Sequence, residues 1–303
     1  MTTPGLVSVI MAAYNSRPYI GAAIESVLAQ QYSNLELLVI DDGSTDGTDQ
    51  EVGRFLGDHR VRYLAQANAG QTAAKNTGIR HSRGEFVAFC DADDVWLRHK
   101  LIAQIPPFAH RERLGVVYSR TSLMDAAGCH LPSDPGDEPP RPSGRVTAQL
   151  FRVNFVPFGT AVVRRRCLDD LGAFDERYRM GIDWELWLRL SLEYDFLFID
   201  DETAMYRVWP GQMSTNWVGR YDHAFRIMEA FLARHPGALA AEDVRGAWAH
   251  SYTQRARQRG AISQEYGPAL ADVARALRLQ PTSLFAWKTL PAVVLAAAGV
   301  RRL

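Results

Sequence analysis

The 303-residue chain has no excess of either charge. Its 34 Lys and Arg residues balance 34 Asp and Glu residues, so the formal net charge is zero. Proteins that bind nucleic acid usually carry a clear basic excess, because they must neutralise phosphates. The balance therefore argues against nucleic acid as a partner.

Cysteines are few and widely spaced. Cys90, Cys129 and Cys167 form an odd set without the close pairs that are typical of zinc sites. A disulfide framework is not expected from this set, and the reducing cytosol is the default compartment.

Long hydrophobic runs and several catalytic signatures are also missing. Residues 1–15 have neither a basic start nor an extended apolar core, so they do not resemble a signal peptide. No window reaches the ~20 apolar residues of a membrane span. The histidines form no ligand set, and no Gly-x-Ser-x-Gly elbow or P-loop is present. We therefore expect a cytoplasmic protein.

The composition is that of an ordinary globular protein, with 47% hydrophobic and 22% charged residues. Charge is unevenly placed, however, because residues 220–303 carry a balance of +6 and residues 1–219 the opposite. A basic helical segment of this kind either forms a solvated surface or rests peripherally on the cytoplasmic face of an anionic membrane.

Strand and helix patterns alternate through the first hundred residues. This order predicts an α/β fold with a mainly parallel central sheet flanked by helices. From residue 220 onward only helical patterns remain, which predicts an all-helical C-terminal extension over 220–303. The sequence indicates strands at 6–14, 35–44, 61–66, 85–94, 195–200 and 203–208, and helices at 17–31, 45–57, 70–84 and 181–194.

The stretch GEFVAFCDADDVW ends an apolar strand in three carboxylates, Asp91, Asp93 and Asp94. Like charges repel, and burying a carboxylate costs free energy unless a partner compensates it. A divalent cation takes such carboxylates as ligands together with the phosphates of a nucleotide. The alternative is a solvated acidic turn that caps the next helix. The position after a buried strand favours a binding site, because ligands of open parallel sheets lie outside the carboxyl ends of the strands.

Two further side chains follow strand ends in the same way. The Asp42 carboxylate can accept the imino hydrogen of a pyrimidine base, and Tyr14 offers a ring face on which that base can stack. Taken alone, each is better explained as a turn acid and a half-buried aromatic residue. Their shared position predicts that they converge with the acidic strand end along one rim.

The stretch GIDWELWLRL predicts an amphipathic helix with Asp183 at its start. A helix cap explains an aspartate at this position well. An exposed carboxylate at a cleft opposite a donor would instead act as a general base. The pattern leaves both interpretations open.

Taken together, these stretches closely resemble the family-2 inverting glycosyltransferases of the GT-A fold, in the nucleotide-diphospho-sugar transferase superfamily. The resemblance implies a GT-A domain over 1–219, with a donor-binding half at about 1–100 and an acceptor-side half at about 101–219. Five stretches carry it in the family's order, namely residues 7–48, 68–94, 172–176, 183–190 and 206–214.

The resemblance implies a nucleotide site at the first strand ends. By position, Tyr14 and Asp42 hold the base, most often uracil in this family, and Ala12 lies beside it. Lys75 occupies the place of a basic residue near the nucleotide. Ala12 also marks a departure, because Ala12-Ala13 replaces a more usual Pro-Thr pair and removes a hydroxyl near the base.

The resemblance also implies a metal and a catalytic base. Asp91, Ala92 and Asp93 match the D-x-D motif, with Asp93 as the direct ligand of Mn²⁺ or Mg²⁺. Asp91 also lies at the metal, nearer the ribose with Ala92. Asp183 matches the base that takes a proton from the acceptor hydroxyl.

Two more departures concern the chemistry. Ile182 stands where the family often has glutamate before the base, and Trp209 stands where it often has histidine near the metal. An indole cannot bind a metal, so either metal dependence is weaker here or the acceptor stacks on the ring.

The first hypothesis is an inverting glycosyltransferase. It would move a sugar, with UDP as the expected nucleotide, to a glycan or lipid-linked acceptor in polysaccharide, glycolipid or glycan synthesis. The second is a catalytically degenerate relative that binds nucleotide or glycan without transfer. A nucleotidyltransferase is a third possibility, but the chain lacks the basic Gly-rich loop that would cradle a triphosphate.

Overall fold

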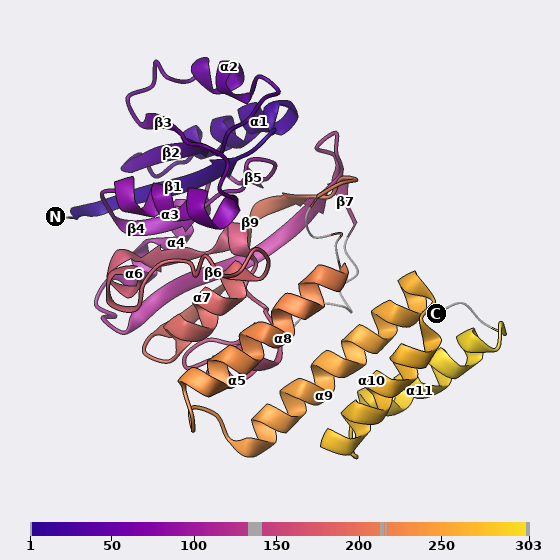
Figure 1. Ribbon diagram of the computed structural model, residues 1–303. Coiled ribbons are helices and arrows are strands. Elements are labelled where there is room, and N and C mark those ends of the chain that lie inside the picture. The colour runs from indigo at the N-terminus through magenta and orange to yellow at the C-terminus, as the bar shows by residue number, and fades with distance from the viewer. Residues whose placement is uncertain (1, 133–140, 213–214, 216, 301–303) are drawn as a thin grey trace. The chain divides into compact units, whose positions relative to one another are not determined.

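The computed structural model describes residues 2–132, 141–212, 215 and 217–300 (Figure 1). The chain forms two compact units. The first consists of Met1–Val146 and Phe155–Thr215, and the second of Thr147–Asn154 and Asn216–Leu303.

The first unit is built on a sheet that has nine strands within the described residues. Their order is β3-β2-β1-β4-β8-β6-β9-β5, and β7 pairs with β6. Strands β3, β2, β1 and β4 run parallel, β8 is antiparallel to its neighbours, and β9 is parallel to β6. The strands are β1 (Thr3–Ala13), β2 (Leu35–Asp41), β3 (Val61–Ala65), β4 (Gly84–Phe89), β5 (Val95–Trp96), β6 (Leu114–Met124), β7 (His130–Leu131), β8 (Val162–Arg164) and β9 (Asp195–Arg207).

Helices surround this sheet, so the predicted α/β architecture with a mainly parallel sheet is confirmed (Figure 1). The two strands expected at 195–200 and 203–208 form one continuous strand, β9. The helices of this unit are α1 (Arg17–Leu28), α2 (Thr48–Gly53), α3 (Gln71–His81), α4 (Lys100–Gln104), η1 (Pro106–Phe108), η3 (Phe158–Thr160), α6 (Arg165–Leu171) and α7 (Ile182–Ser191).

Alternating side chains of β1 give the sheet two apolar faces. Val9 belongs to the core cluster that also contains the buried side of α1. Ile10 meets α3, where a Cβ added to Gly78 would lie 2.5 Å from Ile10 Cγ2. The lack of a side chain at Gly78 thus lets α3 pack closely on the sheet.

The register of the parallel strands brings their carboxyl ends to one edge. Ala13 of β1 pairs with Asp41 of β2, and Ile10 of β1 pairs with Phe89 of β4. The residues that follow these strands, including Asp42 and Asp91, therefore lie along a common rim, as the sequence predicts.

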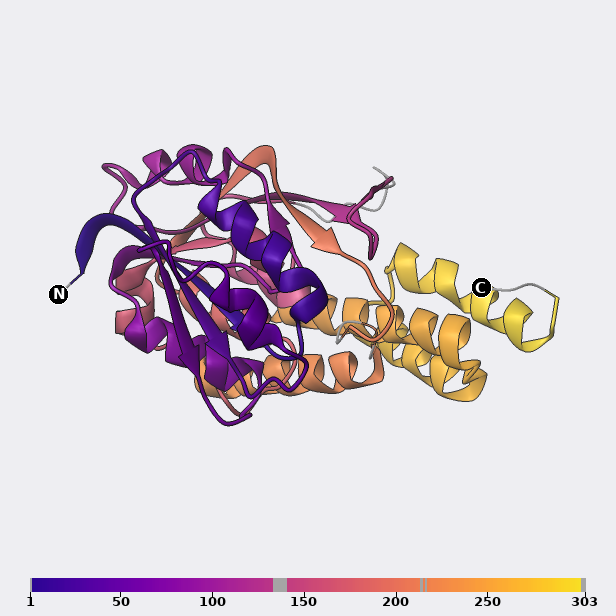
Figure 2. The same ribbon diagram turned by 90° about the horizontal axis from the view of Figure 1, so that it is seen from above.

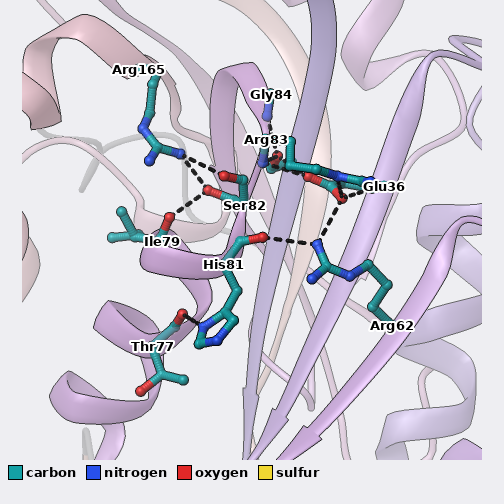
Figure 3. A network of polar contacts seen from close by, with 10 residues as sticks. Glu36, Arg62, Thr77, Ile79, His81, Ser82, Arg83, Gly84 and Arg165 are labelled. Atoms are coloured by element: carbon teal, nitrogen blue, oxygen red, sulfur yellow. Dashed lines mark hydrogen bonds and ion pairs between the residues drawn. The ribbon is translucent and has the colours of Figure 1, made fainter. Parts of the chain in front are cut away.

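The amino ends of the same strands hold a polar network around Glu36 (Figure 3). Its carboxylate accepts hydrogen bonds from Ser8 Oγ at 2.7 Å and Arg83 N at 2.7 Å. It also forms ion pairs with Arg83 and with Arg62, at 2.9 and 3.2 Å. Burial opposes ionisation of Glu36, but these donors outweigh it and lower the pKa of the carboxyl. The network ties β1, β2 and β3 to the turn before β4.

The second unit contains helices and no strand within its described residues, in agreement with the predicted all-helical extension. Helices α9, α10 and α11 pack against one another (Figures 1 and 2). Among the described residues, no helix combines the length and the apolarity needed to cross a membrane. The unit comprises α5 (Thr147–Arg152), α8 (Trp217–Arg234), α9 (Ala241–Gln258), η5 (Arg259–Ser263), α10 (Tyr266–Leu279) and α11 (Leu284–Ala297).

Candidate active site

The acidic strand end after β4 is tied to α3 through a buried lysine. Asp91 Oδ1 lies 3.0 Å from Lys75 Nζ, and the Lys75 side chain is almost completely buried. The same ammonium donates to Gln71 Oε1 at 3.0 Å and lies 4.3 Å from the centre of the Phe158 ring. An aromatic face and a carboxylate both attract a lysine ammonium. Lys75 therefore holds a positive charge beside the D-x-D stretch.

Asp93 is held from the other side by Trp209. The indole Nε1 donates to Asp93 Oδ2 at 2.8 Å. Trp209 is itself fixed, because its backbone N donates to Gln212 Oε1 at 2.7 Å and its ring lies 5.6 Å from that of Tyr19. Burial, followed by the negative charge of Asp91, raises the pKa of Asp93 above its usual range. Trp209 thus occupies the Oδ2 atom of Asp93. The second carboxylate oxygen of Asp93 is Oδ1.

The third acid, Asp94, is buried and serves the backbone. Its Oδ1 accepts a hydrogen bond from Arg207 N at 2.9 Å, while Arg207 Nε donates to Asp93 O at 2.7 Å. Burial, then the charges of Asp91 and Asp93, raise the pKa of Asp94 well above its usual range. Arg207 lies in the stretch 206–214, but no pattern in the sequence predicts a role for it. Met213 and Ser214 of the same stretch fall outside the described residues.

The predicted base-binding residues lie at the ends of β1 and β2. Tyr14 is 55% exposed, and Ala12 is half-buried near the end of β1. Asp42 is only 3% exposed, and its carboxylate accepts bonds from Gln66 Nε2, Ala69 N and Gly70 N at 2.7 to 2.9 Å. These bonds hold the loop before α3, so a base would have to share Asp42 with them. Its contact with a base stays a prediction.

Asp183 lies in the first turn of α7 and is half-buried. The helix cap is Gly181, whose φ of 68° suits glycine, so Asp183 is not the capping residue. The segment leading to it is bonded to α3, since Gln71 Nε2 donates to Arg179 O at 3.1 Å and Thr72 Oγ1 to Tyr178 O at 2.9 Å. The helix that carries Lys75 thus also anchors the approach to Asp183.

The carboxylates fit a divalent cation that shares its ligands with a nucleotide. Across residues 2–132, 141–212, 215 and 217–300, no three His, Cys, Asp or Glu side chains form a complete metal cluster. Mg²⁺ bound with substrate phosphates commonly takes only one or two protein carboxylates. Asp91 and Asp93 match that number, and burial, followed by the negative charge of Asp91, raises the pKa of Asp93.

Comparison with known proteins assigns the sequence to a family. The sequence model of Glycosyl transferase family 2 matches residues 8–172. The Escherichia coli enzyme UDP-Glc:alpha-D-GlcNAc-diphosphoundecaprenol beta-1,3-glucosyltransferase WfgD is 46% identical over 101 residues, which cover 33% of this chain and 40% of that enzyme. The curated relatives that align with about two thirds of the chain include longer proteins, and the chain spans 33% of the length of two of them.

Solved structures give the fold. S. aureus TarS 1–349 in complex with UDP-GlcNAc superposes with a TM-score of 0.67 at 17% identity, covering 97% of this chain and 88% of that one. The mannosyltransferase PcManGT from Pyrobaculum calidifontis, in complex with GDP-Man and Mn²⁺, gives a TM-score of 0.59 at 22% identity, with coverage of 97% and 86%. Both share the GT-A fold with this chain. The chain belongs to glycosyl transferase family 2.

Proposed function

We propose that the enzyme transfers a sugar from a UDP-sugar to an acceptor hydroxyl with inversion at the anomeric carbon. One observation carries this proposal: Asp91, Lys75 and the segment before Asp183 are joined through α3 at the rim of the sheet. The donors named for WfgD and for the TarS complex, UDP-Glc and UDP-GlcNAc, support uridine as the nucleoside. Polymerised or lipid-linked sugar is the proposed acceptor class, in line with the diphosphoundecaprenol acceptor named for WfgD.

The proposed mechanism is a single in-line displacement. The Asp183 carboxylate takes the proton of the acceptor hydroxyl as that oxygen attacks the anomeric carbon. The bond from this carbon to the diphosphate breaks at the same time, so the configuration inverts. Tyr14 stacks on the base, and Lys75 keeps positive charge near the departing diphosphate.

We propose that Asp93, through Oδ1, and Asp91 hold Mn²⁺ or Mg²⁺. Such a cation supplies Lewis-acid stabilisation of the charge that develops on the diphosphate. The Mn²⁺ named for PcManGT supports this assignment. We also propose that the reaction takes place in the cytoplasm, where nucleotide sugars are available to an enzyme of this class.

Asp183→Asn tests the mechanism. The substitution keeps the shape of the side chain but removes its basicity, so transfer from the best donor of a UDP- and GDP-sugar panel should fall by about 10²–10⁴-fold. Donor binding, followed as a thermal shift, should persist. Asp49→Asn is a matched control, because Asp49 stands at the same position of α2, two residues after a glycine cap with positive φ.

A catalytically degenerate protein is the second candidate, favoured by Ile182 before the base and by the indole on Asp93. It would bind a sugar nucleotide without releasing nucleoside diphosphate, with or without acceptor. If wild type and Asp183→Asn bind donor equally and neither turns it over, that reading replaces the first.

A further inference from the structure

Exposed apolar side chains concentrate on α11. Among the described residues, Leu284 is 74% exposed, Trp287 52% and Leu295 39%, and Val294 is exposed as well. A contiguous apolar area on a protein surface commonly marks a site of interaction. We call the exposed side of this helix, formed by Leu284, Trp287, Lys288, Pro291, Val294 and Leu295, the α11 face.

The α11 face lies opposite the side of the helix that is already used for packing. Val293 belongs to the small core that α11 shares with α9 and α10. The exposed residues repeat at three- and four-residue spacing on the other side of the helix. A helix that is apolar on all sides is normally covered on all sides. The buried side consists of Ala286, Thr289, Val293 and Ala296.

The exposed charges carried by α10 and α11 themselves have one sign. Between Tyr266 and Val300 the chain contains a single carboxylate, Asp272. That carboxylate is fully buried, and arginines bind it, among them Arg255 at 2.7 Å and Arg259 at 2.8 Å. Lys288 is exposed next to Trp287 on the face itself. The surface offered by α10 and α11 is therefore apolar and cationic, without an exposed carboxylate.

We propose that the α11 face docks on the surface of an anionic phospholipid bilayer. Leu284, Trp287 and Leu295 enter the headgroup boundary, and Lys288 pairs with lipid phosphates. Trp287 Nε1 donates to Pro281 O at 2.8 Å, so its ring brings no unsatisfied donor into that layer.

Length and charge decide between the alternatives. A helix of 14 residues is about 21 Å long, which is shorter than the ~30 Å hydrocarbon core, so α11 lies on the bilayer and does not span it. A second copy of the chain would bring the same cations to both sides of an interface, whereas anionic lipid complements them. This inference is independent of the transfer chemistry.

Vesicle sedimentation with the full chain tests the proposal. The wild type should bind vesicles of phosphatidylcholine mixed with phosphatidylglycerol, bind phosphatidylcholine alone weakly, and be released in part by high salt. The triple variant Leu284→Ser, Trp287→Ser, Leu295→Ser should bind at least about tenfold more weakly. Leu56→Ser is the control, because Leu56 is comparably exposed but belongs to the first unit.

Control measurements separate a loss of lipid binding from a loss of folding. Circular dichroism and transfer to a soluble acceptor should be unchanged in the triple variant, so that lost binding reports the face and not unfolding. The proposal is overturned if the wild type ignores anionic vesicles, or if the triple variant binds them as the wild type does. Light scattering could instead show that the wild type forms a dimer and the triple variant does not. The α11 face would then bind a second copy of the chain, and the lipid proposal would be overturned. Lys288→Glu should weaken binding to anionic vesicles and leave the weak binding to phosphatidylcholine vesicles unchanged.

Discussion

The two ends of the central strands treat their carboxylates in opposite ways. At the amino ends, Glu36 is surrounded by donors from Ser8, Arg62 and Arg83, and its pKa is lowered. At the carboxyl ends, Asp91 pairs with the buried ammonium of Lys75, and burial, followed by the negative charge of Asp91, raises the pKa of nearby Asp93. A carboxylate that the chain compensates itself stabilises the fold. Carboxylates left in excess suit the proposed site, where a bound cation would bring the missing positive charge.

The largest expected effect on activity comes from removing a carboxylate at the carboxyl ends of the strands. Asp93→Ala should abolish transfer, because it removes the carboxylate proposed to hold the cation. The free energy of unfolding should change little or rise, since the substitution relieves repulsion from Asp91 and Asp94. Donor turnover and urea unfolding measure the two effects. A folded Asp93→Ala variant that still transfers sugar at the wild-type rate would contradict the assignment.

Removing the charge of Glu36 at the amino ends of the strands should instead lower stability and leave activity unchanged. Glu36→Gln should lower the free energy of unfolding by about 2 kcal/mol at neutral pH, because Arg83 and Arg62 lose a buried partner while remaining partly solvated. Transfer activity of the folded variant should be that of the wild type. Asp169→Asn is the control, because it removes an exposed ion pair with Arg165 and should cost less than about 1 kcal/mol.

The effect of Glu36→Gln should also depend on pH. The folded-state pKa of Glu36 is lowered, so the stability that its ionisation contributes is fully present above the unfolded-state value of 4.5. This contribution is lost as the pH falls through the folded-state pKa. Urea unfolding of both proteins between neutral and acidic pH should therefore converge in acid. Parallel curves would show that the charge of Glu36 contributes nothing.

The smallest expected effect comes from altering how Asp93 is held. Trp209→His replaces the indole donor at Asp93 Oδ2 with a side chain that can bind a metal. Transfer should then depend more strongly on Mn²⁺, with half-activation at a lower concentration by a few-fold. Trp209→Phe keeps an aromatic ring and removes the N–H, so it separates added ligation from the lost bond. An unchanged Mn²⁺ titration for Trp209→His would count against this account of the position.

The sheet could be predicted because its information is local. Apolar runs and the polar residues that follow them mark β1, β2 and β4, and β-α-β order fixes their parallel arrangement. The short strands β5 and β8 have too few residues for a pattern, and they are defined by their partners. Helix ends were also overextended, since the helix expected at 45–57 is α2, Thr48–Gly53.

The site was predictable as a set of acids but not as a set of contacts. Asp91, Asp93 and Asp183 stand out by spacing and position. The bond from Trp209 to Asp93 joins residues 116 positions apart, and no local pattern encodes such a pairing. Arg207 likewise shows its role only through its bonds to Asp93 and Asp94.

The three cysteines differ in exposure, and this difference allows the hairpin after β6 to be labelled selectively. Cys90 and Cys167 are buried, and burial raises the pKa of both thiols, whereas Cys129 is exposed. A maleimide dye should therefore modify Cys129 selectively in the natural sequence. Its backbone N donates to Asp125 Oδ1, and Asp125 O accepts from Arg207 Nη1 at 3.2 Å. A fluorophore at this thiol would thus report, without any substitution, when the Arg207 anchor of the D-x-D stretch shifts as donor arrives.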